Sequence, residues 1–392
     1  MTDDIFSAGL EDLAARGLRR AATAFDGGSA RTVTLDGRTL LLFCSNDYFG
    51  LSHDPRIIAA VKEGLDRYGF GSGGSRLISG TRTPHAELER AIASFLGAEA
   101  ALLFGTGFSA NSGVIPAIAE KGDVIFADKL NHASMVDGCR LSRAEFVRYP
   151  HCDMAALEKM LKKAGSVRTR WIITDGLFSM DGDMAPLDEI CSLAKKHDAR
   201  VYVDDAHAFG VLGKNGRGTP ELFGVERDID ILMGTLGKAA GGMGAFAAGK
   251  KSTADWLLNK ARSFIFSTAM PPAVAAGNLK AVEILGNYRT ERNTFMQITE
   301  AFYDRIKTAG FAISYKSYII PLVIGSAGDA LAAAKLLWDD GIFVQAIRPP
   351  AVPEGTSRLR LTLSLAHTEQ DREAVIQCLT KYLGARHKGT GP

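Results

Sequence analysis

The chain has 392 residues, of which 46% are hydrophobic and 23% charged, and its formal net charge of +2 gives no field suited to a polyanion, so we expect no nucleic-acid partner. Five cysteines without a CxxC pair indicate neither a disulfide framework nor a thiolate zinc site. We expect a cytoplasmic protein without a metal, an export signal or a membrane span.

The first 45 residues are expected to form an N-terminal arm. Over residues 9–24, Leu and Ala alternate with Arg and Glu at helical spacing, which predicts a helix. Residues 33–43 predict a strand, a turn at Asp36-Gly37 and a second strand.

Residues 46–275 have the pattern of a large α/β domain. Short apolar runs alternate with helical patterns, and this alternation predicts a mostly parallel sheet with helices on both faces. The predicted strands cover residues 100–104, 123–127, 170–174, 200–204, 229–233 and 245–248.

The last part of the chain, residues 276–392, predicts a smaller α+β domain. Pro271-Pro272 interrupts the preceding pattern, and a helical stretch follows over residues 273–308. Strands are predicted near 319–324, 342–347 and 358–363, with a closing helix from residue 369.

Two short motifs resemble nucleotide-binding fingerprints but lack the required context. Residues 69–74 match GxGxxG, yet a predicted helix precedes them, whereas a dinucleotide site follows a strand. Residues 244–250 match GxxxxGK, yet Lys251 stands where Ser or Thr binds magnesium. Neither NAD nor ATP binding is therefore supported.

Lys238 is a candidate attachment point for a cofactor. It lies in a glycine-rich turn, Gly234-Thr235-Leu236-Gly237-Lys238, after the predicted strand 229–233. Open α/β sheets bind ligands at the carboxyl ends of their strands, and a lysine there can form a Schiff base. Most lysines are solvated surface residues, so this position gains meaning only together with its neighbours.

Asp204 ends another predicted strand and is followed by Asp205, Ala206 and His207. A carboxylate at this point can keep the pyridine nitrogen of pyridoxal 5'-phosphate (PLP) protonated, and His207 can reach the phenolic oxygen of the ring. A helix-cap or turn aspartate is the alternative interpretation, and it suits Asp205 better than Asp204.

A phosphate-binding turn is predicted after the strand 100–104. Residues 105–111 place Gly107 and Phe108 at the start of an apolar helix, where backbone N–H groups and the helix dipole attract a phosphate. Ser179 and Thr235 can add hydroxyl groups from neighbouring strand ends.

His132 follows the predicted strand 123–127 and is a candidate to stack on the cofactor ring. A lone histidine is more often a satisfied core residue. All the candidates fall just past predicted strands, however, as an active site at one edge of a sheet requires. The residues together therefore predict a PLP site.

At these residues the chain resembles the α-oxoamine synthases, a group of PLP enzymes. Similar blocks follow one another from Ser45-Asn46-Asp47-Tyr48 through residues 71–75, 178–183 and 203–207 to 234–238. The resemblance implies a fold-type I PLP-dependent transferase of the aspartate aminotransferase-like class, acting as a homodimer on an amino acid and an acyl-CoA thioester. Residues 347–353 and 358–363 are most similar to the branch that joins L-alanine to a pimeloyl thioester, carried by CoA or a carrier protein.

The resemblance also assigns roles to residues. Lys238 is the implied Schiff-base lysine and general base, and His132 is the implied stacking residue. The implied PLP contacts are Gly107, Phe108, His132, Ser179, Asp204, His207, Thr235 and Lys238, and the implied substrate contacts are Arg19, Asn46, Arg348 and Arg360. Arg360 would grip the amino acid carboxylate, a task that suits a bidentate guanidinium. An exposed strand face is the alternative for Arg358 and Arg360, because they alternate with leucines.

The chain departs from the family pattern at Ala351, Asp175 and residues 241–244. Sister enzymes that use glycine or serine with another acyl-CoA remain open as alternatives. A PLP aminotransferase or lyase, and a non-catalytic protein that kept the fold, are rivals from other classes.

Overall fold

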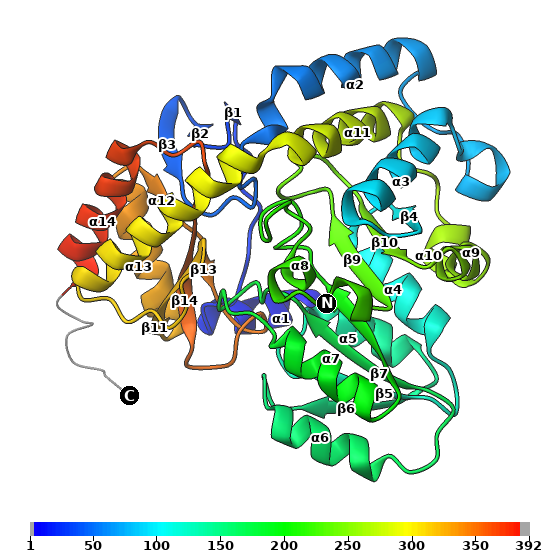
Figure 1. Ribbon diagram of the computed structural model, residues 1–392. Coiled ribbons are helices and arrows are strands. Elements are labelled where there is room, and N and C mark those ends of the chain that lie inside the picture. Colours follow the sequence, from blue (N-terminus) through cyan, green and yellow to red (C-terminus); the bar gives the residue numbers. More distant parts are fainter. Residues whose placement is uncertain (1–3, 385–392) are drawn as a thin grey trace. The chain divides into compact units, whose positions relative to one another are not determined.

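The computed structural model describes residues 4–384, which form two compact units (Figure 1). The terminal unit consists of residues 4–50, 180–183 and 293–384, and the central unit of residues 51–179 and 184–292. The predicted helical stretch 273–308 is two helices, α11 (Pro272–Asn287) and α12 (Arg289–Thr308). The expected domain boundary at residue 275 falls inside α11, which belongs entirely to the central unit.

The central unit is built on a seven-stranded sheet in the order β4-β10-β9-β8-β7-β5-β6. β10 is antiparallel to both its neighbours, whereas the pairs from β9 to β6 are parallel. The predicted mostly parallel sheet is thus confirmed. Its strands are β4 (Ala100–Phe104), β5 (Val124–Asp128), β6 (Glu145–Tyr149), β7 (Arg170–Asp175), β8 (Ala199–Asp204), β9 (Ile231–Thr235) and β10 (Ala245–Gly249).

Helices cover both faces of this sheet, and Figure 1 shows α2 lying beside α11. The helices of the central unit besides α11 are η1 (Leu51–His53), α2 (Pro55–Tyr68), η2 (Arg76–Gly80), α3 (Thr83–Leu96), α4 (Gly107–Ile118), α5 (Ala133–Leu141), α6 (Met154–Lys163), α7 (Leu187–Lys196), α8 (Thr219–Phe223), η3 (Glu226–Asp228), α9 (Lys251–Lys260) and α10 (Arg262–Ile265).

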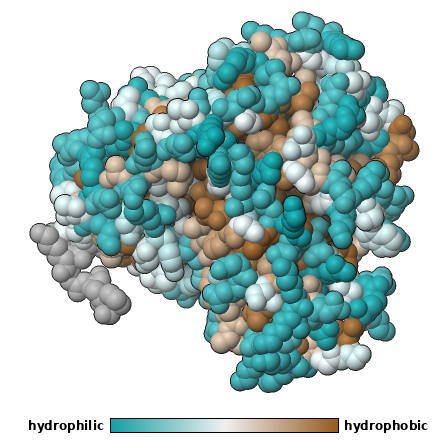
Figure 2. All heavy atoms as spheres, viewed as in Figure 1, coloured by the Kyte–Doolittle hydropathy of each residue, from teal (hydrophilic) through white to brown (hydrophobic). Residues whose placement is uncertain are grey.

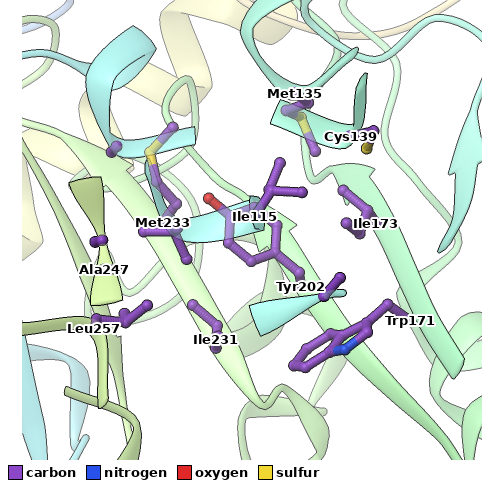
Figure 3. Close-up of a cluster of buried hydrophobic side chains, with 14 of the residues drawn as sticks. Ile115, Met135, Cys139, Trp171, Ile173, Tyr202, Ile231, Met233, Ala247 and Leu257 are labelled. Carbon is purple, nitrogen blue, oxygen red and sulfur yellow. The ribbon is translucent and has the colours of Figure 1, made fainter. Parts of the chain in front are cut away.

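Two hydrophobic cores lie on the two faces of the sheet, because successive side chains of a strand point to opposite sides. Ile125 packs in a core with α4, α5, α9 and α10, whereas its neighbour Phe126 packs in a second core with α6 and α7. Figure 3 shows the first core, in which Tyr202 of β8 lies among Ile115, Ile173 and Met233. Tyr202 is fully buried.

The terminal unit contains two small sheets, in the orders β1-β2-β3-β12 and β11-β14-β13. The strands are β1 (Gly27–Gly28), β2 (Thr32–Leu35), β3 (Arg38–Leu42), β11 (Ile319–Gly325), β12 (Ile342–Phe343), β13 (Ala346–Ile347) and β14 (Ser357–Thr362). α12 begins in the central unit at Arg289 and continues into the terminal unit from Asn293. The other helices of the terminal unit are α1 (Ile5–Ala15), α13 (Ala327–Asp339) and α14 (Glu369–Leu383).

Several predicted elements need correction. The helix expected over residues 9–24 ends at Ala15, because Gly17 takes a left-handed conformation with a φ of 65°. The strand predicted at 342–347 is two short strands that pair in different sheets. The edge strand β6 was not predicted, because its sequence EFVRY carries charged residues in place of an apolar run.

Among residues 4–384, no helix is both long enough and apolar enough to cross a lipid bilayer. On the face seen in Figure 2, hydrophilic residues cover most of the surface, and hydrophobic residues form patches among them.

An ion pair fastens the N-terminal strands of the terminal unit to α14. The buried carboxylate of Asp371 accepts hydrogen bonds from Arg31 Nε at 2.6 Å and Nη2 at 2.8 Å. Burial raises the pKa of Asp371, but hydrogen bonds from Arg31 and Thr368 outweigh burial and bring the pKa to about 2. The ionised carboxylate therefore stabilises the folded chain.

We predict that Asp371→Asn lowers the free energy of unfolding at neutral pH by about 2 kcal/mol, because charge-assisted hydrogen bonds are lost. The pKa of this carboxyl is lower in the folded chain than the value of about 3.9 in the unfolded chain, so the difference is fully present above about pH 4 to 5 and disappears as the pH falls toward about 2. Urea unfolding of both proteins over this pH range measures the effect. The control Asp12→Asn removes only an exposed pair with Arg16, with an expected change below about 0.5 kcal/mol. Equal effects of the two substitutions would contradict the prediction.

Candidate active site

The candidate residues of the central unit gather where its parallel strands end. Asp204 is the last residue of β8, Lys238 follows the end of β9, and His132 lies between β5 and α5. Because parallel neighbours end at the same edge of a sheet, the predicted common edge is confirmed for these strands.

The turn that carries Lys238 is held by Thr235. The hydroxyl group of Thr235 donates to the carbonyl of Gly244 at 2.9 Å and accepts from the backbone N–H of Gly237 at 3.2 Å. The hydroxyl group of Thr235 therefore helps to hold the turn, and its predicted contact with a phosphate stays a prediction. Lys238 itself is half-buried.

The carboxylate of Asp204 is buried, with 4% of its surface exposed. One oxygen accepts a hydrogen bond from Asn111 Nδ2 at 2.7 Å, and the other accepts from the backbone N–H of Ala206 at 3.0 Å. A buried charge requires such donors. Asp204 is therefore fixed in orientation, as an acid that holds a pyridine nitrogen must be.

Asn111, on α4, connects Asp204 to His132. Its Nδ2 also donates to Ser134 Oγ at 2.8 Å, and Ser134 Oγ lies 2.7 Å from Nδ1 of His132. The hydroxyl group of Tyr202 donates to Asn111 Oδ1 at 2.5 Å. Sequence reasoning missed these three polar residues; the only signal was that Asn111 interrupts an apolar helix.

His132 caps the N-terminus of α5. Its Nδ1 accepts from the backbone N–H of Ser134 at 3.3 Å, and its own backbone N–H donates to Asp175 at 2.8 Å. Burial lowers the pKa of His132 and outweighs the opposite effect of Asp204, while Lys238 lowers it further. The imidazole is therefore neutral at pH 7.

Two further acids lie beside Asp204. Asp175 is its partner in the β7–β8 ladder, and burial together with the charge of Asp204 raises the pKa of Asp175 well above the ordinary value. Asp205 is fully buried, and its carboxylate accepts from Thr219 N at 2.9 Å and Thr219 Oγ1 at 2.6 Å. Burial raises the pKa of Asp205 to about 7. Asp205 thus anchors a turn, as the sequence suggested.

The predicted phosphate turn forms the start of α4. The helix begins at Gly107, and Thr106 and Ser109 cap it reciprocally, with Ser109 N donating to Thr106 Oγ1 at 3.0 Å. Phe108 is half-exposed, so the first turn of the helix is accessible to an anion. His207, which is buried, and Ser179, which is half-buried, belong to the same unit.

A second cluster joins Asp128, His151 and Cys152, whose potential ligand atoms lie within 4.8 Å of one another. The Asp128 carboxylate accepts hydrogen bonds from His151 Nδ1 at 2.9 Å and from the backbone N–H of Cys152 at 2.8 Å. These contacts secure a turn after β6, and we assign no ligand to the cluster.

Arg360 of the terminal unit lies on β14 with 6% of its surface exposed, so the alternative of an exposed strand face is wrong. Both terminal nitrogens of Arg360 donate to Asn46 Oδ1 at 3.2 Å. Arg358 is equally buried but forms an ion pair with Asp181 at 2.5 Å. The structure thus brings together Arg360 and Asn46, two of the predicted substrate contacts.

The other two predicted substrate contacts, Arg348 and Arg19, have different surroundings from Arg360 and Asn46. Arg348 is buried and donates to the carbonyl of Gly17, so it fastens the N-terminal segment. Arg19 is exposed. In the same segment, Arg20 donates to the carbonyl of Pro349 at 2.7 Å.

The donor set of the central unit fits PLP. A lysine amine can form the Schiff base, a buried carboxylate can pair with the pyridine nitrogen, and a helix N-terminus can bind the phosphate, while the imidazole offers a ring to pack against. At Gly107, the nearest atom to an added Cβ is Met233 Cε at 3.8 Å, so the backbone leaves room for a bound group.

Comparisons with known proteins agree with this assignment. Residues 38–379 match the family model described as aminotransferase class I and II. The chain is 49% identical over 369 residues to the 8-amino-7-oxononanoate synthase of Geobacter metallireducens, covering 93% of this chain and 94% of the relative.

Two solved structures are similar over most of the chain. Serine palmitoyltransferase from S. paucimobilis, with PLP and myriocin bound, has a TM-score of 0.92 and 32% identity and covers 98% of both chains. The 8-amino-7-oxononanoate synthase of Francisella tularensis has a TM-score of 0.76 and 29% identity, covering 89% of this chain and 99% of the other. The fold is that of fold-type I PLP transferases. The chain therefore belongs to the aminotransferase class I and II family, and within it to the PLP-dependent α-oxoamine synthases.

Proposed function

We propose that this chain is an 8-amino-7-oxononanoate synthase, which joins L-alanine to a pimeloyl thioester and releases the thiol and carbon dioxide. The observation that carries the proposal is a set of groups suited to PLP in a chain that is almost half identical, over nearly its whole length, to an enzyme of that name. The product belongs to biotin synthesis.

The residues divide the chemical work among them. Bound PLP supplies an electron sink for the carbon that carries the amino group. Nζ of Lys238 takes the proton from that carbon and later returns one to the product. The carboxylate of Asp204, held by Asn111, keeps the pyridine proton in place. His132 donates a hydrogen bond to the thioester oxygen as charge develops there.

Substrate binding is proposed for Arg360, Asn46, Arg348 and Arg19. Arg360 has the leading role, because Arg348 already donates to the carbonyl of Gly17. The two nitrogens of Arg360 already point at one oxygen acceptor, Asn46 Oδ1. A carboxylate offers the same fork two acceptors. The family resemblance also supports a homodimer, and light scattering on the purified protein tests this oligomeric state. The resemblance likewise supports a cytoplasmic location.

A specific observation keeps a sister activity as the second candidate. Serine palmitoyltransferase has the higher TM-score of the two solved structures, which favours serine and a longer acyl chain. Sequence identity favours the first candidate, at 49% against 32%. We give identity more weight, because the side chains that select an acyl group depend on sequence more than on backbone path.

A grid of substrates distinguishes the candidates. We expect L-alanine with pimeloyl-CoA or a pimeloyl carrier protein to give the highest kcat/KM, with product identified by mass spectrometry and thiol release followed in parallel. Glycine and serine, and acetyl-, succinyl- and palmitoyl-CoA, complete the grid. Fastest turnover of serine with palmitoyl-CoA would establish the second candidate, and a keto acid formed without thiol release would indicate an aminotransferase.

Lys238→Ala is expected to abolish the borohydride-stable attachment of PLP and to lower kcat by about 10²- to 10⁴-fold or more, since the general base is removed. Peptide mass spectrometry after borohydride treatment locates the attachment. Lys250→Ala is the control, because this exposed lysine follows β10 at the opposite end of the neighbouring strand. PLP found attached to Lys238 in the wild type and in Lys250→Ala supports the assignment. Full turnover by Lys238→Ala refutes it.

Arg360→Lys is expected to raise the KM for L-alanine by about tenfold or more, because a single ammonium cannot make the bidentate contact. PLP absorbance should stay unchanged. Arg305→Lys is the control, because Arg305 pairs with Glu369 and Glu373 at the surface of the terminal unit. An unchanged KM for alanine in Arg360→Lys would remove this arginine from the substrate site.

A further inference from the structure

The hydrogen bonds that link Tyr202, Asn111, Ser134 and His132 allow one consistent assignment of donors and acceptors. We propose that Tyr202, Asn111 and Ser134 are positioning residues that fix His132 as the neutral tautomer with its proton on Nε2. How the enzyme uses this tautomer rests on the proposed function, whereas the tautomer itself belongs to the folded chain.

The assignment of donors and acceptors starts from Asp204, because its role as acceptor is known. A carboxylate oxygen can only accept hydrogen bonds, so the group of Asn111 that lies 2.7 Å from it must be the NH₂ group. The carbonyl oxygen of Asn111 then faces Tyr202, whose hydroxyl group donates to it at 2.5 Å. In Figure 3 the ring of Tyr202 lies in an apolar core with its oxygen at the end away from Trp171. The reversed amide would place two oxygens in contact.

Ser134 links the amide of Asn111 to the imidazole of His132. The second N–H of Asn111 Nδ2 donates to Ser134 Oγ at 2.8 Å, which leaves the serine proton available for His132 Nδ1, 2.7 Å from Oγ. The backbone N–H of Ser134 also donates to Nδ1, at 3.3 Å. Two donors that converge on one ring nitrogen leave no place for a proton on it.

The charges around His132 agree with a neutral ring. Asp204 at the end of β8 favours the charged form, while burial and Lys238 after β9 oppose it and prevail. Asp175 at the end of β7 accepts from the backbone of His132, and its own pKa is raised by burial. His132 therefore presents Nε2–H as a donor to a ligand oxygen, and Nδ1 is not available as a base.

Histidine nitrogen NMR tests the tautomer directly. The protein is labelled with ¹⁵N-histidine, and the signal of His132 among the 8 histidines is assigned by its absence from His132→Gln. Long-range ¹H–¹⁵N correlations near neutral pH, recorded without PLP and with PLP, should show a pyridine-type Nδ1 and a pyrrole-type Nε2. A signal from the Nδ1–H tautomer, or from a doubly protonated ring, would overturn the proposal.

Variants test the role of the chain of hydrogen bonds. Ser134→Ala should give a mixture of both tautomers, while Ser134→Thr, which keeps a hydroxyl group, should retain one. Ser142→Ala is the matched control, because Ser142 caps the other end of α5 and donates to the carbonyl of Cys139. Should Ser134→Ala fail to fold, the isosteric Ser134→Cys replaces it, since a thiol is a weak donor. An unchanged single tautomer in Ser134→Ala, or in Ser134→Cys where that variant replaces it, would exclude Ser134 as a positioning residue. None of these spectra requires an acyl donor, so failure of the proposed reaction would leave this result intact.

Discussion

The buried carboxylate of Asp204 is the group around which the polar side chains of the central unit are arranged. It lies at the end of a strand between two hydrophobic cores, where an unsatisfied acceptor costs about 1–3 kcal/mol and more if charged. Asn111 and the backbone of Ala206 supply the donors. Because Asn111 must turn its NH₂ group toward this carboxylate, the donor and acceptor roles of its other contacts follow. Asp204 and His132, the proposed cofactor-binding acid and the proposed ring-stacking residue, thereby become parts of one network.

The register of the sheet has a second electrostatic consequence. β7 and β8 are paired so that Asp175 lies beside Asp204. Two buried carboxyl groups on paired residues of neighbouring strands do not both ionise readily. Burial and the charge of Asp204 raise the pKa of Asp175. Asp175 nevertheless contributes to the site, since it accepts a hydrogen bond from the backbone of His132. A residue that departs from the family pattern thus helps to position the histidine.

The terminal unit shows how similar arginines take different tasks. Arg348 donates to a backbone carbonyl of the N-terminal segment, Arg358 is paired with Asp181, and Arg360 contacts the neutral amide of Asn46. Arg348 directly follows β13, and Arg358 and Arg360 lie within β14. Their partners come from distant segments, and these partners decide which arginine supports the fold and which suits a carboxylate ligand.

The sequence by itself determined the alternation of strands and helices, the polar residues at the strand ends, and the family. These features are local, because hydrophobic periodicity and a residue's place after a strand are read within about ten positions. Lys238, Asp204, His132 and the turn at Gly107 were predicted in this way. Only the tertiary structure decided that Asn111, Ser134 and Tyr202 connect them, since Asn111 lies 93 residues from Asp204 and 91 from Tyr202. Packing of α4 and α5 on the sheet brings these side chains within hydrogen-bonding distance, and no local pattern encodes that contact.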